Sequence, residues 1–211
     1  MEIEQIAPHL WWWTASHPDW GPEDLKDGQG WAREVSSYAL VEDDALVLFD
    51  PLVPVDDESK FWTALDGDVE QHGSPAILLT VFWHARSSRE IFNRYGGTTV
   101  WAHEPSLEEF VKRAPVTNAF ATGDQLPGGV EALAMHHMAE AAFWIPTHRA
   151  LVFGDTLLGY EDHVQHCPES WLREGESFEA STNALERALA GKQPERLLLT
   201  HGGPRNPALE L

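Results

Sequence analysis

An apolar run near the middle of the chain is the feature that most restricts its fold. Residues 77–83 read Ile-Leu-Leu-Thr-Val-Phe-Trp and stand between Pro75 and the polar segment His-Ala-Arg-Ser-Ser-Arg-Glu of residues 84–90. A run of this length without polar alternation indicates a strand that is buried on both faces. The loop that follows such a strand is a usual place for binding and catalytic side chains. Segment 84–90 is therefore the first candidate for a functional site.

Strands and helices are predicted to alternate around this run. A hairpin is expected from residues 35–41 and 45–49, with its turn at Glu42-Asp43-Asp44. Helices are expected at residues 57–72, from Ser87 or Ser88 to Tyr95, from a Ser-x-x-Glu capping box at Ser106, and at 178–190 with Gly191 as C-cap. A strand is expected at residues 98–102. This alternation implies an α/β layered domain.

Composition limits the partners and the compartment. The 211 residues suit one domain spanning 1–211, and 34 acidic against 14 basic residues give a formal net charge of -20. Such a charge repels phosphate backbones and anionic membranes, so neither nucleic acid nor a membrane is expected as a partner. No apolar run reaches 18 residues and Met1–Gln5 lack a signal-peptide pattern, which makes a cytoplasmic location the expectation.

Cysteine and tryptophan usage add two expectations. Cys167 is the only cysteine, so an intrachain disulfide and a cysteine-rich zinc module are excluded, and a small buried side chain is predicted there. Of ten tryptophans, five fall before residue 32, and residues 17–33 are crowded with Pro, Gly and Asp. We expect most of these tryptophans to pack in the core or within loops and a minority to line a pocket wall.

Several passages together resemble the metallo-β-lactamase superfamily. They are the central run, the hairpin leading to Asp50-Pro51, the passage Phe153-Gly154-Asp155-Thr156-Leu157, and the strand ending in Thr200-His201-Gly202-Gly203. The resemblance covers about residues 35–204. It implies a four-layer αββα sandwich of metallo-β-lactamase type, in which Asp50 supports the metal-binding loops from behind.

The family's HxHxDH motif is degenerate in this chain. Without a gap after Thr80, its ligand positions fall on Val81, Trp83, Ala85 and Arg86, and no ligand survives. With one inserted residue, they fall on Phe82, His84, Arg86 and Ser87. We use the second register, because it retains His84 and places Ile91 on an apolar helix position. A loop histidine without a ligand role is the alternative interpretation of His84.

The resemblance implies one mixed metal site in place of two. Its ligands would be His84, His137 as the third histidine of the first site, Asp155 as the bridging carboxylate, and His201 as the terminal histidine. Zinc is expected at no more than one per chain, or not at all. Arg86 stands where the family has an aspartate, and its permanent cation could pair with Asp155 and take over the role of the missing ion. His136 is expected to be a neighbour of the strand and not a residue of the site.

Three hypotheses follow from these residues. The first, which we favour, is a metal-poor pseudoenzyme whose cleft binds a small molecule or a protein. The second is a mononuclear hydrolase of an ester, thioester or amide, with one zinc and with Asp155 orienting water. The third is a metal-free acid/base enzyme that uses His84, His137, Arg86 and Asp155. The sequence indicates neither a particular substrate nor an oligomeric state.

Overall fold

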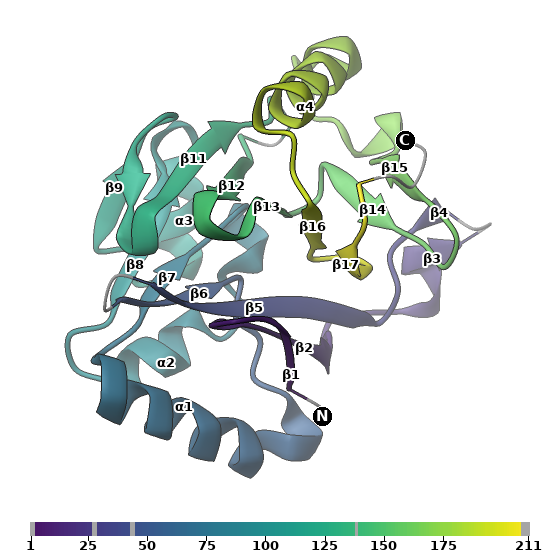
Figure 1. Ribbon diagram of the computed structural model, residues 1–211. Helices are drawn as coiled ribbons and strands as arrows, with labels where there is room; N and C mark the ends of the chain where they lie inside the picture. Colours follow the sequence, from purple (N-terminus) through teal and green to yellow (C-terminus); the bar gives the residue numbers. More distant parts are fainter. Residues whose placement is uncertain (1–2, 27–28, 43–44, 138, 208–211) are drawn as a thin grey trace.

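Two large sheets face each other in this protein, and helices cover their outer faces (Figure 1). The computed structural model describes residues 3–26, 29–42, 45–137 and 139–207. Within these residues, the first sheet has the order β1 (Glu4–Ala7), β2 (Leu10–Ser16), β5 (Glu34–Glu42), β6 (Ala45–Phe49), β7 (Ala76–Leu78), β8 (Thr99–His103) and β9 (Asn118–Phe120). The second has the order β10 (Gln125–Leu126), β11 (Val130–Ala134), β12 (Ala141–Ile145), β13 (Ala150–Phe153), β16 (Arg196–Leu199) and β17 (Gly203–Arg205).

Smaller elements complete the chain. Two short hairpins are formed by β3 (Leu25–Lys26) with β4 (Gln29–Gly30) and by β14 (Leu157–Gly159) with β15 (Val164–His166). The α-helices are α1 (Glu58–His72), α2 (Ser88–Arg94), α3 (Leu107–Arg113) and α4 (Phe178–Lys192). Within the described part of the chain, no helix is long and apolar enough to span a membrane.

The start of the central run lies in β7, which is buried on both faces as predicted, but the strand ends at Leu78 and Phe82–Ala85 forms a 3-10 helix. It pairs in parallel with β6 on one side and β8 on the other. Ile77 points into the core beneath the helices, whereas the next residue, Leu78, points into the core between the sheets. Because side chains alternate across a strand, two buried faces require an unbroken apolar sequence.

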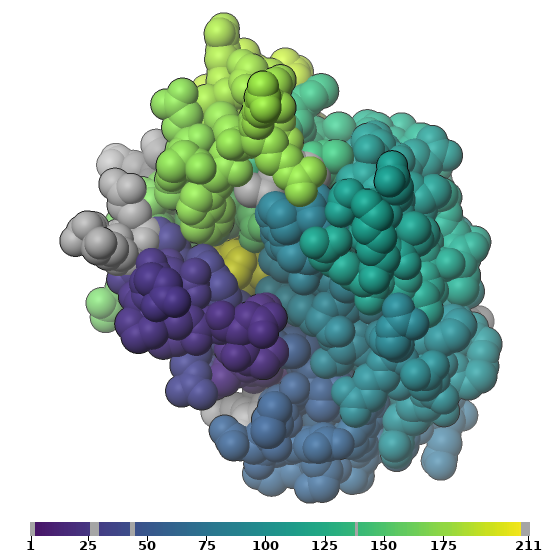
Figure 2. All heavy atoms as spheres, turned by 180° about the vertical axis from the view of Figure 1, so that it is seen from behind, coloured from purple at the N-terminus to yellow at the C-terminus, as the bar shows by residue number. Residues whose placement is uncertain are grey.

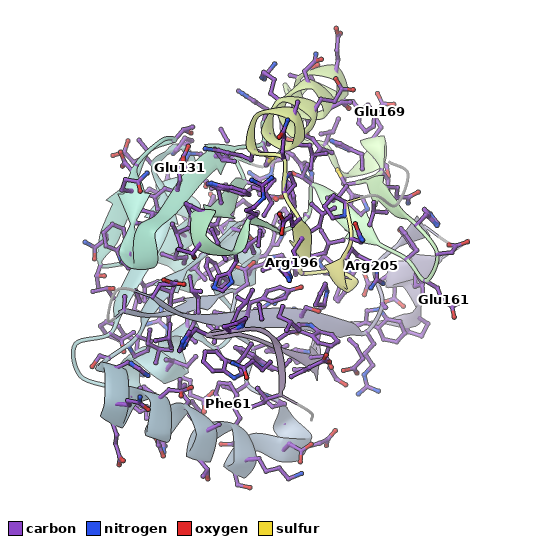
Figure 3. All side chains as sticks on the ribbon, in the orientation of Figure 1. Phe61, Glu131, Glu161, Glu169, Arg196 and Arg205 are labelled. Atoms are coloured by element: carbon purple, nitrogen blue, oxygen red, sulfur yellow. The ribbon has the colours of Figure 1, made fainter. Side chains whose placement is uncertain are left out.

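Three apolar layers hold the four structural layers together. Phe61 and Leu65 of α1, with Ile91 of α2 and Phe110 of α3, pack on the outer face of the first sheet, and Figure 3 shows Phe61 between α1 and that sheet. Tyr38, Phe49, Phe143 and Leu198 are among the residues between the sheets. Leu185 and Ala188 of α4 cover the second sheet, on the side opposite α1 (Figure 1). The predicted αββα sandwich is confirmed.

The predicted helices are present, but their predicted capping interactions differ from those in the structure. Ser87 and Ser106 occupy N-cap positions but make no capping hydrogen bond. The Ser87 hydroxyl accepts a hydrogen bond from the Val53 N–H at 3.0 Å, so it serves the tertiary structure. Helix α4 continues past Gly191 to Lys192 and is capped by Gln193 in the left-handed conformation. The turn expected at Glu42-Asp43-Asp44 lies partly outside the described residues.

Candidate functional site

Polar residues from both sheets meet where parallel strands end. Asp50 follows β6, and His84 lies in the 3-10 helix Phe82–Ala85 after β7; both come from the first sheet. Asp155 follows β13, and His201 follows β16, which pairs in parallel with β13 in the second sheet. Carboxyl ends of parallel strands share one sheet edge, and here two such edges converge. The loops therefore bring together residues that are as many as 151 positions apart in the sequence.

His84 lies between two carboxylates. Its Nδ1 is 2.9 Å from Asp50 Oδ2 and its Nε2 is 3.2 Å from Asp155 Oδ1, and the residue is only 3% exposed. Burial and the charge of Arg86 act to lower the pKa of His84, but Asp155 and Asp50 outweigh them and raise it to about 8. Since both ring nitrogens face acceptors, the geometry is that of an imidazolium that donates two hydrogen bonds.

Asp155 is the centre of the cluster. Its Oδ1 also lies 3.0 Å from His201 Nε2, and its Oδ2 accepts the indole N–H of Trp83 at 2.5 Å. Burial acts to raise the pKa of Asp155, but His84 and His201 hold it well below the usual value. The carboxylate is therefore ionised, with three ring nitrogens around it.

Asp50 fixes the loops on either side of His84. Its carboxylate accepts hydrogen bonds from the Thr80 N–H at 2.9 Å, the Thr80 hydroxyl at 2.5 Å and the Thr200 hydroxyl at 3.2 Å. One side chain thus ties the end of β7 to the end of β16 and orients the His84 ring. This arrangement matches the supporting role that the family resemblance implied for Asp50.

Arg86 lies beside the cluster without touching Asp155. Its Nη1 donates to the Ser36 carbonyl at 3.1 Å and to the Asp50 carbonyl at 3.0 Å. The Nε and Nη2 atoms are buried and have no hydrogen-bond partner. The expected direct ion pair is not formed, because the Arg86 nitrogens are directed to backbone carbonyls and no salt bridge between described residues joins Arg86 to Asp155. The Arg86 charge acts on the two aspartates through space.

The remaining predicted ligand positions are not part of this group of converging ligand atoms. His137 is fully buried, with Nδ1 3.6 Å from the Cys167 sulfur and 3.9 Å from Glu140 Oε2. Phe82 packs into the core under the first sheet, and the Ser87 hydroxyl is used by Val53. Cys167 is a free, buried thiol, as predicted. His84 is thus the only position of the degenerate motif whose side chain provides a ligand atom to the cluster.

One metal ion could be held by the residues that do meet. His84, Asp155 and His201 each offer a ligand atom, these atoms lie within 4.8 Å of one another, and they form the only such group in the described chain. Two imidazoles and a carboxylate are a donor set that zinc accepts. Nδ1 of His84 is anchored by Asp50, but Nδ1 of His201 is buried without a partner. The donor set fits one ion and does not provide for a second.

Glu140 is a buried residue that the sequence did not single out. Its carboxylate accepts three backbone N–H groups, from Gly154 at 2.9 Å and from Asp155 and Thr156 at 2.8 Å each. Burial and the Asp155 charge raise the pKa of Glu140 to about 8, against the lowering effect of those N–H groups. Glu140 therefore shapes the loop that presents Asp155. A glutamate after His136-His137 carries no motif, so only the three-dimensional contact reveals it.

A cleft of about 680 Å³ opens over the cluster. It is lined by His17, Pro18, Asp19, Trp31, Leu52, Trp83, His84, Ala85, Arg86, Ser87, Arg113, Asp155, Trp171 and His201. Figure 2 shows a hollow in which C-terminal atoms (yellow) lie deep between N-terminal (purple), teal and light green segments. The Trp31 ring lies 5.1 Å from the His201 ring, so the tryptophan-rich N-terminal loop does contribute a wall.

Comparison with known proteins identifies the fold. No family model and no curated protein sequence matches the chain. The solved structure of DIM-1 metallo-beta-lactamase aligns at 14% identity with a TM-score of 0.70, covering 99% of this chain and 92% of that one. A metallo-beta-lactamase from Pontibacter korlensis aligns at 15% identity and a TM-score of 0.70, covering 99% and 94%. A metallo-beta-lactamase family protein from Thermus thermophilus aligns at 19% identity and a TM-score of 0.66, covering 96% and 76%. The protein therefore has the metallo-β-lactamase fold.

Proposed function

We propose that this protein keeps the metallo-β-lactamase fold without a dinuclear zinc centre, and that its cleft binds a small molecule. The observation that carries the proposal is the donor count at the base of the cleft. Among the residues that the structure describes, only His84, Asp155 and His201 bring ligand atoms together there. A catalytic zinc uses three protein ligands by itself, so a second ion would lack a ligand set of its own.

The charge of the cluster supports the metal-poor form. Asp50 and Asp155 carry two negative charges, and Arg86 and the doubly hydrogen-bonded His84 carry two positive charges. These charges balance inside a buried site, as buried charges generally must. A divalent ion in place of the His84 proton would leave the same group with a net charge of +1. The residues are thus neutral as a group before any metal enters.

A mononuclear hydrolase of an ester, thioester or amide is the second candidate. It is favoured by the convergence of three ligand atoms beneath an open cleft. A zinc ion held there would supply a Lewis acid that polarises a carbonyl and acidifies water. In that case the Asp155 carboxylate, fixed by Trp83, would orient the water, and the cleft would hold the acyl group.

Elemental analysis by mass spectrometry separates the two candidates. Untagged protein, purified without chelator and then equilibrated with zinc and dialysed, should contain well below one metal per chain. The matched variants are His201→Ala in the cluster and His136→Ala, an exposed histidine outside it. Two metals per chain would overturn the proposal. One zinc per chain that is lost with esterase activity in His201→Ala, but not in His136→Ala, would establish the second candidate.

A further inference from the structure

Three guanidinium groups lie around the cleft. Arg86 and Arg113 line it, and Arg173 lies 5.3 Å from the centroid of the cleft residue Trp83. The chain has a formal net charge of -20, so a local group of three cations runs against its overall balance. Like charges repel, and their collection at a cleft focuses a positive potential there.

The two outer arginines are held over one aromatic ring. The guanidinium carbons of Arg113 and Arg173 lie 4.9 Å and 4.4 Å from the centroid of Phe82. A ring in this position attracts cations and keeps them at the mouth of the cleft, although the two arginines come from α3 and from the segment before α4. Arg173 lies next to Trp83, whereas Arg113 also forms an ion pair with Glu109, with Nη1 3.2 Å from Oε2, so part of the Arg113 charge is balanced before any ligand binds.

Arg86 places a third guanidinium group in the cleft lining, where its charge is balanced by those of Asp50 and Asp155. Its Nη1 donates hydrogen bonds to two carbonyls. Its Nε and Nη2 atoms, the pair with which an arginine can chelate a carboxylate, are buried and have no acceptor in the described chain. The field of Arg86 reaches the opposite wall: burial and then the Arg86 charge lower the pKa of His17 to about 4. An anion in the cleft would therefore have three guanidinium groups near it, those of Arg86, Arg113 and Arg173.

The other lining residues indicate what the uncharged part of a ligand would be. Trp31, Trp83 and Trp171 offer flat apolar surfaces, and Trp83 is 38% exposed. Asp19 and Asp155 also line the cleft and would repel a second negative charge. We propose that the cleft binds a singly charged aromatic carboxylate, with its ring against the tryptophans and its carboxylate at the arginines. This proposal rests on the proposed function.

Calorimetric titration of metal-free protein, treated with chelator and dialysed, tests the ligand class. The probes are 2-naphthoate, its neutral isostere 2-naphthamide, and 2-naphthyl phosphate. Naphthoate should bind saturably, and its affinity should fall as sodium chloride rises from about 0.05 to about 0.5 M, because salt screens the arginines. The amide should bind at least about fivefold more weakly. Equal binding of amide and naphthoate, or no naphthoate binding up to about 10 mM, would overturn the proposal. Tighter binding of the phosphate would replace the carboxylate by a dianion and overturn the charge assignment.

Surface variants test the arginines without disturbing the cluster. Arg113→Gln and Arg173→Gln should each weaken naphthoate binding about threefold, and the double variant about tenfold, with naphthamide binding unchanged. Arg94→Gln is the matched control, since Arg94 also stacks on an aromatic ring, Trp62 at 4.6 Å, but does not line the cleft. Wild-type affinity in the double variant, at an unchanged melting temperature, would contradict the assignment.

The outcomes for the metal and for the anion are independent. Stoichiometric zinc in the purified protein would overturn the metal-poor function, while the titration of the metal-free form would still decide between an acid and its amide. Failure of naphthoate to bind, with no zinc present, would overturn the anion assignment and leave the donor count at His84, Asp155 and His201 untouched.

Discussion

At the scale of single residues, Arg86 is the strongest departure from a metal-binding loop. Its backbone is in the left-handed region, with φ 36°, which a residue with a Cβ rarely adopts. Two hydrogen bonds from Nη1 to the Ser36 and Asp50 carbonyls hold it there. The side chain therefore braces the backbone around Asp50 and contributes charge to the cluster at the same time.

Arg86→Gln should destabilise the protein. The change removes a cation near two buried aspartates and takes one donor each from the Ser36 and Asp50 carbonyls, so we expect the free energy of unfolding to fall by about 1 to 4 kcal/mol. Urea unfolding measures the change. Arg86→Lys separates the two effects, since lysine keeps the charge but not the fork of donors. An unchanged midpoint of urea unfolding in Arg86→Gln would mean that the Arg86 side chain does not stabilise the fold.

His17 should make the protein less stable in mild acid. Its folded pKa of about 4 lies below the ordinary 6.5, so the unfolded chain binds the extra proton first as the pH falls. The His17 contribution to stability is therefore complete above about pH 6.5 and is lost progressively down to about pH 4. Urea unfolding across this range should show a shallower pH dependence for His17→Gln than for the wild type. Parallel curves would show that His17 titrates normally.

At the scale of elements, the loop after β13 depends on close packing as well as on Glu140. A Cβ added at Gly154 would lie 2.5 Å from the Thr80 hydroxyl and 3.2 Å from Glu140 Cδ. Both neighbours are buried and hydrogen-bonded, so neither can easily move. A glycine is required at this position because two loops of the site touch there.

Gly154→Ala should lower the free energy of unfolding by about 1 to 3 kcal/mol through overpacking. Gly67→Ala is the matched control, because Gly67 lies inside α1 and an added Cβ would meet nothing within 4 Å. The control should stabilise the protein by up to about 1 kcal/mol through helix propensity. Thermal unfolding measures both variants, and an equal response would refute the contact between the loops.

The elements themselves could be predicted, but several of their ends could not. An unbroken apolar run identified β7, and the expected hairpins and helices are present. The predicted capping hydrogen bond of Ser87 is absent because its hydroxyl interacts with a residue far away in the sequence. The Ser87 hydroxyl accepts a hydrogen bond from the N–H of Val53, which is 34 residues away. Ser106 fits a capping box by sequence, yet its hydroxyl is buried without a partner. The local sequence predicts that a helix forms, but it does not predict which residues of the fold contact the first turn of that helix.

At the scale of the whole molecule, the site joins parts of the chain that only the fold brings together. Trp83 and Asp155 are 72 residues apart, and Asp50 and Thr200 are 150 apart. The family resemblance was needed to single out His84, Asp155 and His201, because spacing alone links none of them. It did not foresee that His137 would face Cys167, or that Arg86 would turn to carbonyl groups. Those outcomes depend on side-chain direction, which sequence order does not encode.

Salt should stabilise the protein as a whole. With 34 acidic and 14 basic residues, repulsion among surface charges opposes the compact state. Raising sodium chloride from about 0.02 to about 0.3 M shortens the range of this repulsion, so the melting temperature should rise by a few degrees. Scanning calorimetry at fixed pH measures it. A lower melting temperature at high salt would mean that attractive ion pairs outweigh the net charge.

The two sheets each supply half of the buried cluster, and this has a consequence for folding kinetics. Asp50 and His84 come from the first half of the chain, and Asp155 and His201 from the second. In a state with only one sheet formed, Asp50 and His84 could still pair with each other, but Asp155 and His84 would lack their contact across the sheets. Closing contacts over such long sequence separations is slow. Ligand binding should therefore return only with the last phase of refolding, after most secondary structure has already formed.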